Sequence, residues 1–309
     1  MSAQPARSTA KPGRTASLLM RLGLSPRTAV IAVPYVWLLL FFFTPFLIVL
    51  KLSFAEIAIA IPPYTPLFDG EGNLQGTLEN YELLLEDDLY WRSYLNSLKI
   101  ALISTLLALA IGYPIAYAMA RAPSQWRMLL LMLVILPFWT SFLIRVYAWI
   151  GILKSEGLLN LLLISIGLID QPLQILHTEL AVYIGIIYSY LPFMVLPLYA
   201  TLEKMDHSLL EAASDLGCPP LKAFWQITVP ISMPGIIAGC FLVFIPAVGE
   251  FVIPDLLGGN STLMIGRTLW TEFFSNRDWP LASAVAVILL ALLVVPIMYF
   301  QRQQMKQQG

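Results

Sequence analysis

The chain has 309 residues and a formal net charge of −1; 58% of its residues are hydrophobic and only 12% are charged. An average soluble domain has about 25% charged residues, so this composition excludes an ordinary soluble globular protein. We expect membrane lipid, and no nucleic acid, around the chain.

The first 28 residues form a basic segment. Five basic residues and no acid occur in 1–28, and Arg21 interrupts the short apolar stretch among them. A signal peptide needs an uninterrupted apolar core of about 7–15 residues, which this segment does not contain. The first long apolar run follows directly and is too long for such a core. We therefore predict a cytoplasmic N-terminal segment, 1–28, and an uncleaved first span that acts as a signal anchor.

Six apolar runs approach the length of about 20 residues that a helix needs to cross a hydrocarbon core. In chain order they are Ala29 to Leu50, Ile100 to Ala120, Met128 to Ile144, Leu180 to Leu202, Pro234 to Pro254 and Leu281 to Phe300. Membrane helices tolerate the prolines inside them because neighbouring groups satisfy the freed carbonyl groups. The sequence predicts an all-α polytopic membrane protein with a transmembrane domain at 29–300 and a short tail, 301–309.

One further apolar segment is ambiguous. Gly157 to Ile169 is only 13 residues long, which suits an interfacial or re-entrant helix better than a span. Without it both chain termini lie on the same side of the membrane, and with it they lie on opposite sides.

The basic residues decide between these topologies. With six spans, eleven of the 18 Lys and Arg residues fall in the segments on the side of the N-terminus. Because cytoplasmic loops carry an excess of Lys and Arg, we predict cytoplasmic termini and a cytoplasmic loop at 203–229. The opposite loop, 52–98, carries eight acids and one base. It is either an ordinary solvated surface or a weak electrostatic funnel for cations.

No catalytic or nucleotide-binding pattern is present in the sequence. GxxxxGK[ST], GxSxG and HExxH are absent, so the chain lacks the usual phosphate-binding loop and is not expected to be an enzyme. Cys218 and Cys240 lie in different environments, and His177 and His207 lie in separate loops, so no disulfide or metal site is predicted. Any use of ATP would depend on another chain.

The most informative polar stretch is the loop after the fourth span, 203–229. Ser208 and Glu211 have capping-box spacing, Asp206 is a rival N-cap, and Gly217 can end the helix that follows. The prolines after Gly217 forbid its continuation, and a second helix from Leu221 leads into the fifth span. On this pattern alone, a helical hairpin on the membrane surface is an equally good interpretation.

The letters EAASDLG, followed by Ile227 and Pro230, resemble the EAA loop of ABC importer permeases. The resemblance implies that 203–229 holds a coupling helix that docks in a groove of a separate ATPase subunit. It assigns the contact to Asp206, Glu211, Ala212, Ala213 and Gly217. Small alanines permit close helix approach, Glu211 can meet basic groups, and Gly217 permits the turn.

Further stretches extend the resemblance over about 30–300. They include GYPIAYAMA, LPFWTSFLIRVYAWIGILK, IPAVGEFVIPDLLGG and NRDWPLASA, and they resemble permease subunits of polyamine importers, most of all the putrescine permeases of Gram-negative bacteria. This implies a multi-pass inner-membrane protein whose loop 52–98 is periplasmic. The implied partners are a second permease chain, an ATPase dimer that binds ATP and Mg, and a periplasmic binding protein. The chain itself is expected to bind no cofactor.

The polar residues of the fifth apolar stretch suit a cationic substrate without reference to any family. Glu250 lies within this stretch and Asp255 near its end, and a carboxylate at such depth usually faces a cavity, a partner or a transport pathway. The alternative is a structural ion pair between Glu250 and Arg145. We also assign Trp139, Tyr147 and Tyr190 to the pathway, because aromatic faces attract ammonium groups. Interfacial aromatic belts explain many such residues without a substrate.

Three other functions stay open on the sequence. An importer permease for ferric ion, sulfate or thiamine would keep the loop, although Glu250 and Asp255 favour a cation. An ion-coupled secondary transporter usually has internal repeats, and none is visible. A membrane-embedded enzyme would need a nucleophile or metal constellation, which the sequence lacks.

Overall fold

The computed structural model describes residues 26–68, 75–206, 208–259 and 262–308. The predicted segment 1–28 lies almost wholly outside the described residues, as does the last residue of the predicted tail. Within the described ranges the regular structure is helical, and the only strand-like pairing is an isolated bridge between Ile57 and Tyr64. The predicted all-α class is confirmed.

The helices divide into long apolar elements and short connecting ones, with π-helical turns at η1, η3 and η4 and a 3-10 turn at η2. In chain order they are α2 (Pro26–Leu38), η1 (Leu39–Phe43), α3 (Thr44–Leu52), α4 (Glu79–Glu86), α5 (Asp88–Arg121), α6 (Ser124–Ile135), η2 (Leu136–Trp139), α7 (Phe142–Leu153), α8 (Leu158–Ser165), α9 (Glu179–Leu202), α10 (Ser208–Asp215), α11 (Pro220–Ala223), η3 (Phe224–Thr228), α12 (Val229–Val248), α13 (Val252–Leu256), α14 (Ile265–Trp270), η4 (Thr271–Ser275) and α15 (Trp279–Gln308).

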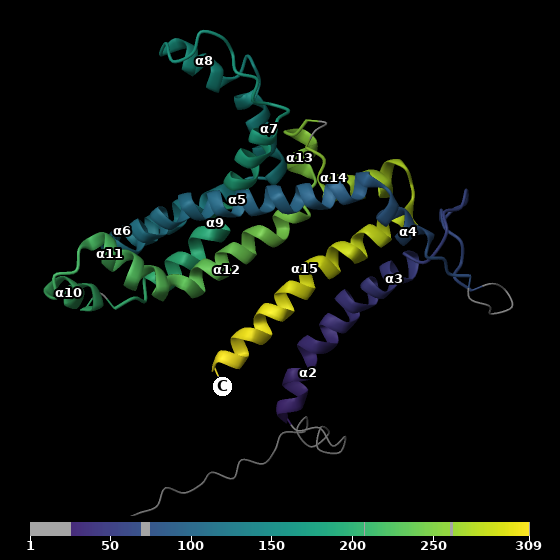
Figure 1. Cartoon of the computed structure of the whole chain (residues 1–309), viewed down its shortest axis with the longest axis horizontal. Helices are drawn as coiled ribbons and strands as arrows, with labels where there is room; N and C mark the ends of the chain where they lie inside the picture. Colours follow the sequence, from purple (N-terminus) through teal and green to yellow (C-terminus); the bar gives the residue numbers. More distant parts are fainter. Residues whose placement is uncertain (1–25, 69–74, 207, 260–261, 309) are drawn as a thin grey trace, which may run out of the picture.

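Helices α5, α9 and α12 pack against one another and form the centre of the molecule (Figure 1). Glycines at the contacts allow this close approach. A Cβ atom on Gly239 of α12 would lie 2.8 Å from Met194 Sδ and 3.1 Å from the Met194 carbonyl oxygen of α9. Membrane helices associate largely through such close packing, because lipid removes the hydrophobic drive between them.

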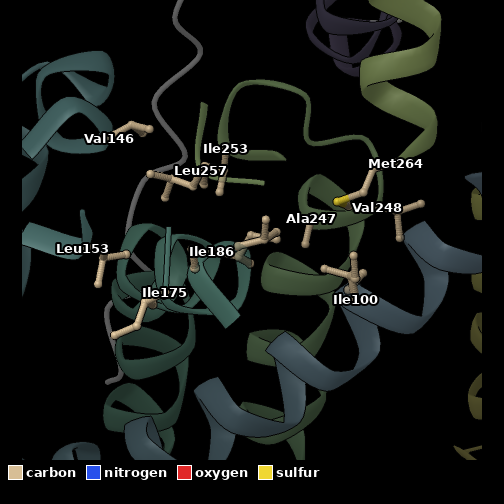
Figure 2. Close-up of a cluster of buried hydrophobic side chains, with 13 residues drawn as sticks. Ile100, Val146, Leu153, Ile175, Ile186, Ala247, Val248, Ile253, Leu257 and Met264 are labelled. Carbon is tan, nitrogen blue, oxygen red and sulfur yellow. The ribbon is translucent and has the colours of Figure 1, made fainter. Parts of the chain in front are cut away.

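A buried apolar cluster joins this centre to α7 and α13. Figure 2 shows Ile100 of α5, Ile186 of α9 and Val248 of α12 converging beneath Ile253 and Leu257. Each of these side chains is fully buried. The short helix α13 is therefore fixed to the bundle by its apolar side chains, and this fixes the turn that precedes it.

The N-terminal helices lie at the edge of the molecule. Helix α3 runs beside α15, whereas the span Val30–Leu52 buries none of its most apolar window inside the chain (Figure 1). Its exposed apolar side chains require lipid or another protein as their environment.

Among the described residues, five helices are long and apolar enough to cross a membrane: Val30–Leu52, Asp88–Arg121, Phe142–Ser165, Glu179–Leu202 and Pro220–Val248. Two further apolar helices, Ser124–Trp139 and Trp279–Val295, are shorter by this measure. The predicted polytopic membrane fold is confirmed, but several predicted boundaries are not.

The third predicted span, Met128 to Ile144, is not continuous. Its first part ends in the 3-10 turn η2, where the Thr140 hydroxyl and amide both donate to the Pro137 carbonyl group at 2.9 and 3.3 Å. Thr140 and Ser141 are extended before α7 begins at Phe142. The ambiguous segment forms α8. Together with α7 it makes up the apolar stretch Phe142–Ser165, which is long enough to cross a membrane. The Asn160 side chain holds α8 in place through hydrogen bonds with the Leu173 backbone.

The second and fifth predicted spans are also shifted. Helix α5 begins at Asp88, so the last part of the predicted outer loop 52–98 is helical, as is α4 within it. The fifth helix runs from Pro220 to Val248 instead of ending at Pro254. Gly249 and Glu250 break it, and Glu250 therefore lies in a turn rather than inside a span.

Candidate functional site

A cavity of about 400 Å³ lies at the break between α12 and α13. Its lining comes from η2, α7, α9 and the turn after α12, and it combines aromatic rings with an acid and a base. The lining residues are Phe138, Phe142, Arg145, Ser189, Tyr190, Phe193, Pro246, Gly249, Glu250, Phe251 and Val252. Mostly apolar walls with a few converging polar groups are typical of small-ligand sites.

The Glu250 carboxylate is fixed by four donors. Oε1 accepts hydrogen bonds from the amides of Phe251, Val252 and Ile253 at 3.1, 3.0 and 3.4 Å. Oε2 accepts from the Tyr190 hydroxyl at 2.5 Å. The side chain is only 7% exposed, and these bonds compensate the cost of burying a carboxylate. The site thus presents an oriented acid beside aromatic rings.

Arg145 shares the cavity but does not neutralise Glu250. Its guanidinium lies over the rings of Phe138 and Phe142, 5.6 and 5.7 Å from their centroids. Its Nε and Nη1 atoms are buried and have no hydrogen-bond partner among the described residues. No ion pair joins Arg145 to Glu250 within the described part of the chain, so the structural ion pair considered as an alternative is not formed.

The other predicted pathway residues have separate positions. Tyr190 lines the cavity. Asp255 lies outside the lining and forms an ion pair with Arg267 at 3.1 Å. Trp139 and Tyr147 also lie outside it and are largely exposed on the outer surface. The structure therefore brings together Glu250 and Tyr190 but not the remaining three.

The sequence did not predict four aromatic residues that line the cavity: Phe138, Phe142, Phe193 and Phe251. Single aromatics in apolar runs cannot be told from lipid-facing ones by spacing alone. One signal was available, since Pro246 and Gly249 mark a helix break directly before Glu250.

The loop 203–229 forms the predicted short helix, α10. The Asp206 side chain accepts from the Ser208 amide at 2.9 Å, which supports Asp206 over Ser208 as the capping residue. At the other end Gly217 has φ of 74°. The Cys218 amide donates to the Ala213 carbonyl and the Gly217 amide to that of Ser214, both at 2.9 Å. This is a Schellman C-cap, as the predicted turn at Gly217 requires.

The surface of this loop is unusually apolar. Leu216, Leu221 and Trp225 are 88%, 72% and 63% exposed. Glu211 and Ala212 are also exposed, whereas Ala213 is buried against the rest of the loop. Apolar side chains so exposed at a polar loop are typical of surfaces that contact another protein or the membrane.

Known proteins resemble the chain over most of its length. The spermidine/putrescine transport system permease protein PotB of Haemophilus influenzae is 43% identical over 272 residues, which cover 88% of this chain and 92% of that protein. PotB of Escherichia coli K12 is 44% identical over 266 residues, covering 86% and 93%. The inner membrane ABC transporter permease protein YdcU of Escherichia coli is 30% identical over 67% and 70% of the two chains.

Solved structures agree on the fold. A chain of a bacterial ABC transporter that imports the acidic polysaccharide alginate superposes with a TM-score of 0.69 at 16% identity, covering 95% of this chain and 98% of that one. The same kind of transporter, in complex with an alginate pentasaccharide-bound periplasmic protein, superposes with a TM-score of 0.67. At this identity the likeness concerns the fold alone.

The family profile covers the part of the chain that holds the cavity and the loop. Residues 108–304 match the family described as binding-protein-dependent transport system inner membrane component, whose members are transport permeases and not enzymes. The matched residues include the whole lining of the cavity, the capped loop helix α10 and the helices from α6 to α14. The chain belongs to the family of binding-protein-dependent transport system inner membrane components, the permeases of ABC importers.

Proposed function

We propose that this chain is a permease subunit of an ATP-driven importer for polyamines, with putrescine among its substrates. The observation that carries the proposal is the buried Glu250 carboxylate in an aromatic-lined cavity, in a chain whose relatives are spermidine/putrescine permeases. Protonated amines are bound by carboxylates through charge-assisted hydrogen bonds and by aromatic rings through cation–π attraction. The cavity offers both.

The proposed assembly contains a second, homologous permease chain, two ATPase subunits and a periplasmic binding protein. This chain supplies half of the pathway, and ATP and Mg are bound by the ATPase subunits. The match to the family of binding-protein-dependent transport system inner membrane components supports the binding-protein partner. Both termini and the loop 203–229 lie in the cytoplasm on this proposal.

The loop helix α10 is the proposed contact with the ATPase. It presents Glu211 and Ala212 to solvent, beside the exposed side chains of Leu216 and Leu221. Asp206 and Gly217 cap the two ends of the helix, and Ala213 packs it against the chain. A surface that is capped, rigid and apolar suits docking to another protein better than contact with water.

A permease for another small cation is the second candidate. The fold does not decide, because the structurally similar alginate importer carries an acidic polysaccharide. Arg145, which forms no ion pair within the described ranges, shares the cavity with Glu250 and makes it less negative than a simple amine site. The family match argues against an ion-coupled secondary transporter.

Uptake competition in a reconstituted system tests the proposal. The complete complex would be placed in proteoliposomes with internal ATP and supplied with labelled putrescine. Unlabelled putrescine and spermidine should compete for uptake, whereas sulfate, thiamine and ferric citrate should not. Absence of ATP-dependent putrescine uptake, or uptake that spermidine does not inhibit and thiamine or ferric citrate does, would contradict a polyamine substrate.

A further inference from the structure

Six aromatic rings contact one another in a continuous series that ends at the Glu250 cavity. We call this series the aromatic file. Its members, in spatial order, are Tyr64, Trp279, Phe273, Phe274, Trp270 and Phe251. Successive ring centroids are 6.3, 5.2, 4.9, 4.0 and 4.5 Å apart. The file begins in the segment before α4, at Tyr64, and its last ring, Phe251, lines the cavity next to Glu250.

The backbone at the middle of the file is irregular in a way that aligns the rings. Trp270 ends α14, and the π-helical turn η4 follows from Thr271 to Ser275. Trp270 and Phe274, four residues apart, project on one side, while Glu272 turns inward and accepts hydrogen bonds from Tyr90 and Asn276. Isolated π-helical turns are rare and occur frequently at functional sites.

Two rings of the file are exposed although they contact each other. Trp270 is 43% and Phe274 is 55% exposed, so the file offers aromatic surface to whatever lies beside it. An interfacial belt would also expose aromatic rings, but it gives no reason for ring-to-ring contact that leads into a cavity holding a carboxylate.

The charges around the file suit a cation. Asp278 lies on the segment that carries Phe274 and Trp279, next to the single base of that segment, Arg277. The Glu272 carboxylate, in contrast, is buried and accepts hydrogen bonds from Tyr90 and Asn276. The cavity carboxylate at its inner end is held in a fixed orientation. Aromatic faces attract ammonium groups.

We propose that the aromatic file is a binding track along which an alkylammonium chain moves from Tyr64, in the segment before α4, to Glu250. The inference rests on the proposed function, because it assumes an amine substrate. It adds a site outside the cavity, with Trp270 and Phe274 as the exposed contact residues and Phe251 as the last ring before the carboxylate.

Fluorinated tryptophan at position 270 tests the track directly. Mono-, di- and trifluorotryptophan keep the shape of the ring but progressively weaken the negative potential of its face. In reconstituted complexes, putrescine uptake should fall stepwise, by about tenfold for the trifluorinated ring, given the usual strength of a cation–π contact. Binding-protein-stimulated ATP hydrolysis should stay within about twofold of the parent, since the coupling loop is untouched.

The control is the same series at Trp126, which is 52% exposed on α6 and outside the file. Phe274→Leu, which keeps an apolar side chain without a ring, is the second variant and should also lower uptake. Uptake that is unchanged by fluorination at Trp270, or that falls equally with fluorination at Trp126, contradicts the binding track. A parallel fall in ATP hydrolysis contradicts it as well, because it indicates a structural role for Trp270. If the unmodified complex takes up no amine, the proposed function is wrong, and the proposal of a binding track, which depends on an amine substrate, is wrong as well.

Discussion

Replacement of Glu250 by glutamine tests the cavity most directly. Glutamine keeps the size of the side chain and an acceptor for the α13 amides, and its amide group can donate to the Tyr190 hydroxyl. The fold should therefore survive, because the loss is limited to charge assistance of four hydrogen bonds. We expect a normally assembled complex with impaired transport.

The size of the effect follows from the charge that is lost. At about 4 Å and an effective dielectric constant of about 20, a carboxylate and an ammonium attract by about 4 kcal/mol, which corresponds to roughly a thousandfold in binding. Arg145 in the same cavity reduces the net field, so we expect a decrease of about 10²-fold in uptake at low substrate concentration for Glu250→Gln. Tyr190→Phe removes one hydrogen bond to the ionised acid and should lower uptake by about 2 kcal/mol of binding free energy, or about thirtyfold.

The assay is uptake of labelled putrescine by reconstituted complexes, with ATPase content measured in the same preparations. Glu179→Gln is the matched control, because Glu179 forms an exposed ion pair with Lys99 and does not line the cavity. It should leave uptake within about twofold, as expected for a surface ion pair. Near-normal uptake kinetics in a normally assembled Glu250→Gln complex would refute the role of this acid.

Four further outcomes can be measured. Ala212→Asp, at an exposed position of α10, should leave membrane insertion intact but reduce co-purification of the ATPase; equal co-purification with the parent contradicts the docking surface. Gly217→Val places a β-branched residue at φ of 74°, where an added Cβ would meet no other atom within 4 Å. The backbone strain alone should therefore destabilise the turn by about 1–2 kcal/mol and uncouple ATP hydrolysis from transport. Unchanged coupling counts against the assignment. Gly266→Ala adds a Cβ that overlaps the Gly249 carbonyl oxygen and lies 2.7 Å from the Glu250 carbonyl oxygen. The turn must shift, so uptake should fall. An unaltered KM would indicate that this turn does not position Glu250. For topology, single cysteines at Gln75 and Gln304 in a background without Cys218 and Cys240 should react with an impermeant reagent in intact cells only at Gln75; the reverse pattern inverts the orientation.

The sequence predicted the helical class and the loop helix because their signals are local. The cap at Asp206 and the glycine at 217 act over a few residues, and both are present in the structure. Boundaries of the spans were less accessible, because apolar residues continue across helix breaks. Thr140 and Ser141 interrupt an apolar run, yet only their hydrogen bonds and extended backbone reveal the end of a helix.

The cavity could be predicted only in part. A buried acid was inferred from its cost in lipid, and this reasoning identified Glu250 and suggested a connection with Arg145. The sequence did not reveal that Tyr190 would donate to the acid, because the two residues are 60 positions apart, and the amide donors one to three residues after Glu250 depend on the helix break that the predicted span did not contain. It also placed Asp255 in the pathway, whereas the tertiary fold pairs it with Arg267.

The loop and the cavity lie at opposite ends of one helical element. Pro220–Val248 is continuous over 29 residues, and at 1.5 Å per residue it is about 43 Å long. Its first turn follows the cap at Gly217, and its last residue precedes Gly249 and the amides that hold Glu250. A packed helix moves as a unit, so on the proposed function a displacement that begins at the ATPase contact reaches the Glu250 turn without a separate chain of side-chain contacts. The described part of this element can bend at the π-helical turn η3 near the loop end, and at Pro234 and Pro246 within α12, the second of which lines the cavity.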